Sequence, residues 1–464
     1  MKRERFEDLE VIDINSKGKG VLKSNDGKVI FVQGAVPGDK VTIETYKKKG
    51  GYFEARLIEV NHPSTNSINP VCKHFGICGG CKWQHLSYKM QLQFKQKEIL
   101  HNLKNISGMV LPKIDKIKAA EQTYFYRNKM EYAFSDQRWL STEEIKVKTE
   151  TLEKKGLGFH KSGMWDKVVD IDKCHLQQEP ANAIRNCVKQ FALDNNLEFF
   201  NHREKSGFLR TLMIRNSSQG EFMVLIQFYR EDIANREAIL KHLKDKFNLT
   251  SLLYCINSKA NDTLYDQEII VYSGSEFITE VMEKLKFKIN AKSFFQTNSN
   301  QAYELYKITR EFAGLKGYEL VYDLYTGTGT IAQFIADKCN KVVGIESVPE
   351  AIAVAKESAE INGITNAFFE VGDIRKVFNQ DFINRHGVAN VVITDPPRNG
   401  MHPDVIKQLL NLTPDKIVYI SCNNATQARD LSLMKEKYKL SKCQALDMFP
   451  QTQHIENIVL LEKI

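Results

Sequence analysis

The chain has 464 residues, of which 42% are apolar and 26% charged, and its formal net charge is +8. This composition is typical of a soluble globular protein and excludes a disordered or collagen-like chain. No apolar run approaches the ~18 residues of a membrane-spanning helix, and the basic start of the chain lacks the apolar core of a signal peptide. We therefore expect a cytoplasmic protein without a membrane partner, divided into two to four domains.

Residues 1–61 are predicted to form a small OB-like β-barrel. Short β-type runs alternate there with turn signals such as Asn25-Asp26-Gly27 and Pro37-Gly38-Asp39, at a spacing typical of barrels. Such barrels often bind nucleic acid through a basic loop, which Lys47–Lys49 would suit. The same lysines would also be ordinary at a solvated hairpin tip.

Residues 62–276 are expected to form a central α+β domain. A segment rich in Pro, Ser and Asn at 61–70 marks its boundary with the barrel. The region contains a helical stretch near Met90–Leu103 and a predicted hairpin over residues 209–230, "LRTLMIRNSSQGEFMVLIQFYR". No internal repeat divides it further.

Four of the nine cysteines gather in this central region. Three of them, Cys72, Cys78 and Cys81, lie in one short segment, "CKHFGICGGC", and Cys174 follows "DKVVDIDK". An odd number of cysteines in a long chain argues against a disulfide framework. Three thiols so close together, with two adjacent glycines, indicate a metal site. The spacing alone leaves zinc and iron–sulfur open. Four other cysteines lack partners and are expected to be buried, namely Cys187, Cys255, Cys339 and Cys443.

From about residue 277 to 464, strands alternate with amphipathic helices, which predicts a doubly wound parallel sheet. The segment "ELVYDLYTGTGTIAQFIADK" runs from a buried strand into a glycine turn at a helix start, where backbone N–H groups can approach a ligand. Glu346 ends the next strand, where a carboxylate can take both hydroxyls of a ribose. Asp373 and Asp395 end the third and fourth strands, so all these side chains should meet at the carboxyl edge of the sheet.

Two cofactor classes fit this edge. A dinucleotide-binding fold would normally have a third glycine at position 332, which is Ala here, although Ala is tolerated in some such folds. The combination of Asp323, Glu346 and Asp395-Pro396-Pro397 resembles the S-adenosylmethionine-dependent methyltransferases. We therefore expect a class I, Rossmann-like methyltransferase domain rather than an NAD enzyme.

A fifth strand, Lys416–Ser421, ends at Cys422, which places a thiol on the same edge. The thiol is either a small hydrophobic group closing the strand or a nucleophile. Carbon 5 of a pyrimidine becomes reactive only after a nucleophile has added to carbon 6, and a base must then remove the carbon 5 proton. His454 and Glu456, at the start of the last strand, offer that base. Because a free thiol is only ~3% ionised at pH 7, we expect nearby helix N-termini and Arg398 to activate Cys422.

These motifs resemble the RNA uracil-5-methyltransferases of the RumA/TrmA type over nearly the whole chain. Ser421-Cys422-Asn423 is similar to the catalytic cysteine motif of that family, His454-x-Glu456 to its base motif, and "FFQTN" at 294–298 to a segment near the cofactor and uracil. The resemblance implies Cys422 and Glu456 as catalytic residues. It implies the following cofactor-site residues: Gln296, Tyr325, Thr330, Glu346, Asp373 and Asp395.

The resemblance also implies roles for the N-terminal and central regions of the chain. Residues 1–61 would be a TRAM barrel, and Cys72, Cys78, Cys81 and Cys174 would hold the four-iron, four-sulfur cluster of the 23S rRNA members of the family. Arg127 and Lys129 would lie near RNA and cluster, or form an ordinary surface pair. Asn424 departs from the family pattern, which usually has Pro there, and could loosen the loop that carries Cys422.

The expected activity is therefore methylation of carbon 5 of a uridine in structured RNA, with the base flipped out of its stack. The resemblance favours 23S rRNA over transfer RNA as the partner. We also expect a monomeric enzyme. Two other functions stay open: an amino-group methyltransferase in which Cys422 is merely buried, and a non-catalytic RNA-binding protein. The complete set of polar strand-end residues argues against a non-catalytic RNA-binding protein, because a chain that had lost its activity would have lost at least one of them.

Overall fold

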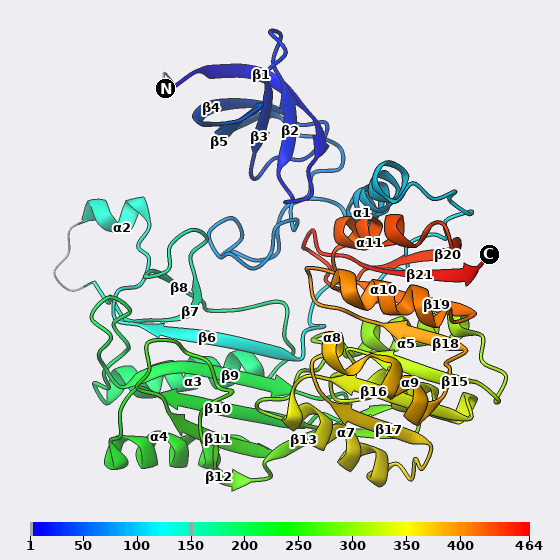
Figure 1. Cartoon of the computed structure of the whole chain (residues 1–464). Coiled ribbons are helices and arrows are strands. Elements are labelled where there is room, and N and C mark those ends of the chain that lie inside the picture. Colours follow the sequence, from blue (N-terminus) through cyan, green and yellow to red (C-terminus); the bar gives the residue numbers. More distant parts are fainter. Residues whose placement is uncertain (1–2, 148–151) are drawn as a thin grey trace.

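The computed structural model describes residues 3–147 and 152–464 and consists of a barrel and two large sheets (Figure 1). The barrel lies at one end of the molecule, and the two sheets lie side by side beneath it. Helix α1 (Tyr88–Asn102), close to the predicted 90–103, continues as a π-helical turn at Leu103–Ser107 and packs against the C-terminal half of the chain.

The predicted N-terminal barrel is confirmed: five strands close in the order β1-β2-β3-β5-β4. Their bounds are β1 (Arg5–Ile14), β2 (Gly20–Lys23), β3 (Val29–Val32), β4 (Lys40–Lys49) and β5 (Tyr52–His62). The three lysines 47–49 form the end of β4, beside the glycine turn at 50–51. The barrel rests on the central region through Ile14 and Val36, which pack in one apolar cluster with Trp83 and Leu86.

The central region is a seven-stranded, mostly antiparallel sheet with the order β12-β11-β10-β9-β6-β7-β8. Its strands are β6 (Lys129–Ser135), β7 (Gly156–His160), β8 (Val168–Asp170), β9 (Leu209–Asn216), β10 (Phe222–Phe228), β11 (Ser251–Ile256) and β12 (Ile270–Gly274). Its helices are α2 (Thr142–Val147), α3 (Ala181–Asp194) and α4 (Ile233–Lys246). The hairpin predicted over 209–230 is the antiparallel pair β9 and β10.

The C-terminal half does not begin with strand–helix alternation as predicted. It begins with an antiparallel pair, β13 (Phe277–Met282) and β14 (Leu285–Asn290). Buried and half-buried residues alternate along β13, which is the period of a strand with one covered face. The alternation of strands and helices starts only after this hairpin, with α5 (Ser299–Ala313).

The second seven-stranded sheet has the order β17-β16-β15-β18-β19-β21-β20. Its strands are β15 (Leu320–Leu324), β16 (Lys341–Glu346), β17 (Ala367–Val371), β18 (Val391–Thr394), β19 (Lys416–Ser421), β20 (Tyr438–Leu446) and β21 (Glu456–Lys463). Its helices are α5, α6 (Thr330–Ile335, followed by a short 3-10 turn at Ala336–Lys338), α7 (Pro349–Ile361), α8 (Ile374–Val377), α9 (Gln380–His386), α10 (Pro403–Leu412) and α11 (Asn424–Met434). The first five strands are parallel, and β21 runs antiparallel to β19.

Two hydrophobic cores cover the two faces of this sheet. Val321 of β15 packs with α5, α6 and α7 on one face, whereas its neighbour Tyr322 packs with α1, α9, α10 and α11 on the other. Strands covered on both faces read as continuous apolar runs, which is why their positions could be predicted. Among the described helices, none combines the length and apolar character needed to cross a membrane.

Candidate functional site

The glycine turn, residues 325–329, follows β15, and its backbone is strained and closely packed. Tyr325 has a φ of +64°, which is uncommon for a bulky residue and is found mainly where surrounding structure enforces it. Gly329 has a φ of +72°, and a Cβ there would lie 2.7 Å from the Phe369 ring. Only glycine fits this position, so the turn is held against its neighbours before α6 begins.

Asp323 lies buried at the end of β15 beneath this turn. Its carboxylate accepts a hydrogen bond of 2.5 Å from the Thr326 hydroxyl. Burial, which disfavours the charged form, and the nearby Glu346 carboxylate outweigh this bond and raise the pKa of Asp323 to about 7.

Glu346, at the end of β16, joins the glycine turn to the next helix. Its Oε2 accepts from the Gly327 N–H at 3.2 Å, and its Oε1 accepts from the Ser347 and Val348 N–H groups at 2.7 and 3.1 Å. The carboxylate is thus fixed in orientation and still half-buried at the edge. Glu346 thus lies at the strand end where the sequence placed it, and its role in ribose binding stays a prediction.

Four of the other predicted cofactor residues lie at the same edge, namely Tyr325, Thr330, Asp373 and Asp395. Gln296 lies in the segment between β14 and α5, and its place at the cofactor stays a prediction. Thr330 is buried as the first residue of α6. The Gln296 backbone is held by Asn128, whose side-chain amide donates to the Gln296 carbonyl at 2.9 Å. Asp373 is tied up in an ion pair with Arg375, which holds the pKa of Asp373 at about 2. Its carboxylate is therefore less available to a ligand than that of Glu346.

The predicted nucleophile and base face each other across neighbouring strands. In the antiparallel pairing of β19 with β21, Ser421 lies opposite Asn457, so Cys422 and Glu456 flank the same rung of the sheet. Asp395 follows the adjacent strand β18. Burial and the nearby Asp323 carboxylate raise the pKa of Asp395 to about 7.

The expectation that the strand end activates the Cys422 thiol is wrong for the chain without ligands. Burial, and then the Glu456 and Asp395 carboxylates, raise the pKa of Cys422 to about 11, and Arg398 lowers it only in part. Burial and two acidic neighbours therefore outweigh one exposed guanidinium. Ionisation of the thiol has to be favoured by a positively charged ligand or by proton transfer to a neighbour.

Glu456 has the properties of a proton acceptor. It is 5% exposed, and its pKa is raised well above the ordinary value by burial and by the Asp395 carboxylate, with Arg398 opposing. A carboxylate with a raised pKa is a stronger base than an ordinary glutamate, which suits general base catalysis near neutral pH.

The sequence prediction missed the side chains that join the loops at this edge. Asn423 caps α11 and donates to the Arg398 carbonyl at 2.9 Å, which ties the cysteine loop to the Asp-Pro-Pro-Arg loop. Its position between a strand and a helix is a capping signal that could have revealed this. Asn424, predicted to loosen the loop, is 4% exposed and its side chain contacts Asn102 and Glu98 of α1, so the loop is held there.

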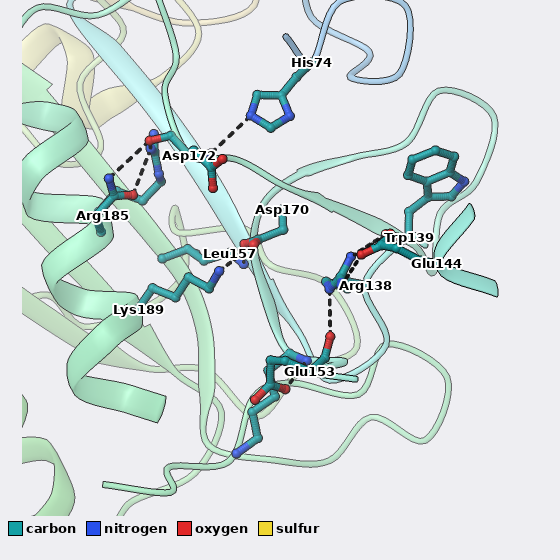
Figure 2. A network of polar contacts seen from close by, with 12 residues as sticks. His74, Arg138, Trp139, Glu144, Glu153, Leu157, Asp170, Asp172, Arg185 and Lys189 are labelled. Atoms are coloured by element: carbon teal, nitrogen blue, oxygen red, sulfur yellow. Dashed lines mark hydrogen bonds and ion pairs between the residues drawn. The ribbon is translucent and has the colours of Figure 1, made fainter. Parts of the chain in front are cut away.

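Four cysteines line a second site, a cavity of about 600 Å³ between the central sheet and the loop before α1. The cavity is lined by Cys72, Cys78, Cys81 and Cys174, and also by Arg127 and Lys129. The backbone N–H of Asp172 donates to His74 Nε2 at 3.2 Å, and Arg185 contacts the Asp172 carbonyl, as Figure 2 shows. These contacts connect the segment with Cys174 to the loop with the other three cysteines.

The side chains around this cavity are not placed as ligands of a single ion. Within residues 3–147 and 152–464, no three His, Cys, Asp or Glu side chains form a group that could hold one metal ion. The cavity lining alone therefore does not identify a bound group, and the four-iron, four-sulfur cluster stays a prediction.

The remaining cysteines only partly follow the burial prediction. Three are buried, namely Cys255, Cys339 and Cys443, whereas Cys187 on α3 is half-buried. Partial burial raises the pKa of the Cys187 thiol, and the Lys246 ammonium opposes this shift.

The chain is similar to known RNA methyltransferases in both sequence and fold. A family model described as tRNA (Uracil-5-)-methyltransferase matches residues 207–464. Proteins of Porphyromonas gingivalis and Bacteroides thetaiotaomicron, both named as uncharacterized RNA methyltransferases, are 48% and 49% identical, covering 98% and 96% of this chain and 99% of each relative. The crystal structure of Pyrococcus abyssi tRNA (uracil-54, C5)-methyltransferase with S-adenosyl-L-homocysteine is similar with a TM-score of 0.76 at 29% identity, covering 99% of this chain and 100% of that one.

Proposed function

Since the chain belongs to the RNA uracil-5-methyltransferase family, we propose that it methylates carbon 5 of one uridine in structured RNA through a covalent bond to Cys422. The observation that carries this proposal is the pairing of β19 with β21, which sets a thiol and a buried carboxylate beside the acidic cofactor edge. An amino-group methyltransferase would have no use for this pair.

In the proposed mechanism, Cys422 Sγ, as thiolate, adds to carbon 6 of uracil and leaves carbon 5 as an enolate carbon. S-adenosylmethionine, when bound, would supply the electrophilic methyl group for carbon 5, and its sulfur would keep the electron pair of the broken S–CH3 bond as S-adenosylhomocysteine. Glu456 then accepts the carbon 5 proton, and the electron pair of that C–H bond restores the 5,6 double bond as Cys422 leaves as thiolate. Asp395 and Asp323 line the cofactor side of the edge, and Glu346 would hold the ribose.

The carboxylates of this edge suit a cationic cofactor. The pKa values of Asp323, Asp395 and Glu456 are all raised by burial and by one another or by Glu346. A sulfonium group nearby would favour their ionised forms. One chain supplies the nucleophile, the base and the cofactor edge, which supports a monomeric enzyme.

We also propose that Cys72, Cys78, Cys81 and Cys174 hold a four-iron, four-sulfur cluster that joins two loops of the central region. The common cavity of about 600 Å³ supports it. Protein purified without oxygen should be brown, with about four irons per chain. Colourless anaerobic protein with one zinc per chain would contradict the cluster.

The identity of the RNA has two candidates. The resemblance of the four cysteines to those of rRNA enzymes favours 23S rRNA. The names of the matching family model and of the P. abyssi enzyme favour transfer RNA instead.

Mapping 5-methyluridine in 23S rRNA and transfer RNA from cells with and without the gene tests the activity and the substrate together. Loss of one 5-methyluridine from 23S rRNA is the result that we expect. Loss from transfer RNA would identify the second candidate, and unchanged 5-methyluridine in both would contradict the proposed function.

A further inference from the structure

The loop that leads into the base strand, Asp447–Thr452, is held by one buried glutamine of α1. The Gln91 side chain is fully buried. Its Nε2 donates to the Trp83 and Leu86 carbonyls at 3.0 and 2.9 Å and contacts Gln451 Oε1 at 3.0 Å. Its Oε1 accepts from the Gln451 backbone N–H at 3.0 Å. One amide thus joins the loop before α1 to Gln451, which lies 360 residues after Gln91 in the chain.

The backbone of Gln451 completes this junction. Its carbonyl accepts from the N–H groups of Lys82 and Trp83 at 2.9 and 3.0 Å, immediately after Cys81. Gln451 has a φ of +68°, a conformation that a side-chain-bearing residue keeps only where its surroundings enforce it. The junction is the feature that enforces it here.

A second side chain of α1 fixes the other end of the loop. Lys95 lies one turn after Gln91 on the same face of the helix. Its Nζ donates to Asp447 Oδ1 at 2.5 Å and to the Phe449 carbonyl at 3.2 Å, and both side chains of the Lys95–Asp447 pair are 0% exposed. The loop is therefore held against α1 at both ends.

This arrangement ties the start of β21 to distant parts of the molecule. From Gln451 the chain passes through a short turn, in which the His454 N–H donates to the Thr452 hydroxyl at 3.2 Å, and reaches Glu456. On the other side of the junction, the Trp83 indole N–H donates to the Gly18 carbonyl of the barrel at 3.3 Å. The base is thus connected through Trp83 to the cysteine loop and to the barrel.

We propose that Gln91 is a positioning residue for Glu456: it fixes the start of β21 relative to Cys422, so that the base reaches the carbon 5 proton when the cysteine loop and barrel are docked. The inference rests on the proposed function, because it takes Glu456 as the base. Gln91 would therefore act on the step that breaks the Cys422–uracil bond, and not on cofactor binding or on attack by the thiol.

The test compares single-turnover rates of methyl transfer and of RNA release in Gln91→Met with those of the unchanged protein and of Glu456→Gln. Gln91→Met keeps the length of the side chain and removes all of its hydrogen bonds. We expect methyl transfer within about twofold of normal, release at least tenfold slower, and a methylated protein–RNA adduct on a denaturing gel. Affinity for S-adenosylmethionine should not change.

Gln96→Met is the matched control. Gln96 lies on the same helix, and its side chain accepts from the Ile117 N–H at 2.7 Å. The adjacent Lys118 carbonyl accepts from the Asp447 N–H at 3.0 Å, so Gln96 supports the Asp447 end of the loop, whereas Gln91 holds the Gln451 end that leads directly to Glu456. This variant should release RNA normally. Gln91→Glu, which keeps the shape and the acceptor for the Gln451 N–H but loses the amide donors, serves as a second variant if Gln91→Met does not fold.

The outcomes separate this inference from the proposed function. Adducts in both Glu456→Gln and a Gln91 variant, with none in Gln96→Met, support the inference. An adduct in Glu456→Gln alone, or equal slowing of transfer and release in the Gln91 variants, overturns it and leaves the proposed function standing. Normal turnover by Glu456→Gln overturns both. Failure of both Gln91 variants to fold also overturns the inference, because it assigns Gln91 to folding only.

Discussion

At the carboxyl edge of the C-terminal sheet, burial and neighbouring carboxylates raise the pKa values of the two predicted catalytic residues. Burial raises the pKa of both Cys422 and Glu456, the Glu456 and Asp395 carboxylates add to the shift at Cys422, and Asp395 adds to that at Glu456. Burial and these carboxylates therefore oppose ionisation of the thiol and of the Glu456 carboxyl until a positive charge arrives. This ordering would keep Cys422 unreactive in the absence of cofactor, because the thiolate is the nucleophilic form.

The raised pKa of Asp395 makes stability depend on pH. The folded pKa is about 7, against an ordinary value of 3.8, so its contribution to stability is fully present below about pH 4 and is lost as the pH rises through 7. Asp395→Asn stays uncharged at every pH. In protein without cofactor, its free energy of unfolding should therefore gain roughly 1 to 3 kcal/mol relative to the unchanged protein between pH 5 and 8. A pH-independent difference in thermal melting would contradict this.

Glu346 provides a direct test of the cofactor edge. If it binds the ribose, Glu346→Ala should weaken S-adenosylmethionine by about 1.5 to 3 kcal/mol, the range of a hydrogen bond to a charged group. Isothermal titration calorimetry measures this. Glu350→Ala is the matched control, since Glu350 is an exposed carboxylate in the first turn of α7 and should bind normally. Equal affinity of both variants for S-adenosylmethionine would show that Glu346 does not bind the cofactor.

The strands of the C-terminal sheet could be predicted from the sequence together with their site residues, whereas the role of helix α1 could not. Strands β15, β16, β18 and β19 could be predicted, because buried apolar runs end in Asp323, Glu346, Asp395 and Cys422. Helix α1 could be predicted only as a helix. Its buried face carries Gln91 and Lys95, residue types that are ordinarily exposed, and their partners lie more than 350 residues away. No local pattern encodes such contacts.

The buried pair of α1 should matter for stability as well as for position. Lys95→Met leaves Asp447 buried without its cation, which should cost about 3 to 5 kcal/mol in the free energy of unfolding. Lys97→Met, two residues further along, removes only an exposed pair with Asp13 at 2.6 Å, which should cost about 0 to 1 kcal/mol. Chemical denaturation measures both. Similar losses in the two variants would mean that the Lys95–Asp447 pair contributes little.

At the scale of the whole molecule, the barrel and the reacting edge belong to one connected structure. Trp83 contacts the barrel with its side chain and the loop before β21 with its backbone. The sequence predicted the barrel and the C-terminal sheet separately, because each has its own periodicity. How they dock depends on a small cluster around Trp83, Leu86 and Val36, which no periodic pattern marks.

The basic end of β4 tests the role of the barrel in binding. Replacing Lys47, Lys48 and Lys49 with Ser should weaken RNA binding and lower the slope of log K against log salt by about 0.7 to 0.9 for each phosphate that the variant no longer neutralises. Cofactor affinity should not change. The control replaces three exposed lysines of α4, namely Lys241, Lys244 and Lys246. Equal effects of the two triple variants on RNA binding would show that the barrel lysines act only through net charge.

The central claim is that Cys422 forms the bond to uracil and Glu456 allows that bond to break. The most direct measurement is denaturing electrophoresis of Glu456→Gln after incubation with substrate RNA and S-adenosylmethionine labelled in its methyl group. Glu456→Gln keeps the shape of the side chain but cannot accept the proton. We predict a slower protein band that carries RNA and labelled methyl, requires the cofactor, and is absent when Cys422→Ala is added to the same chain. Normal turnover by Glu456→Gln without any adduct, or wild-type methylation by Cys422→Ala alone, would contradict the mechanism.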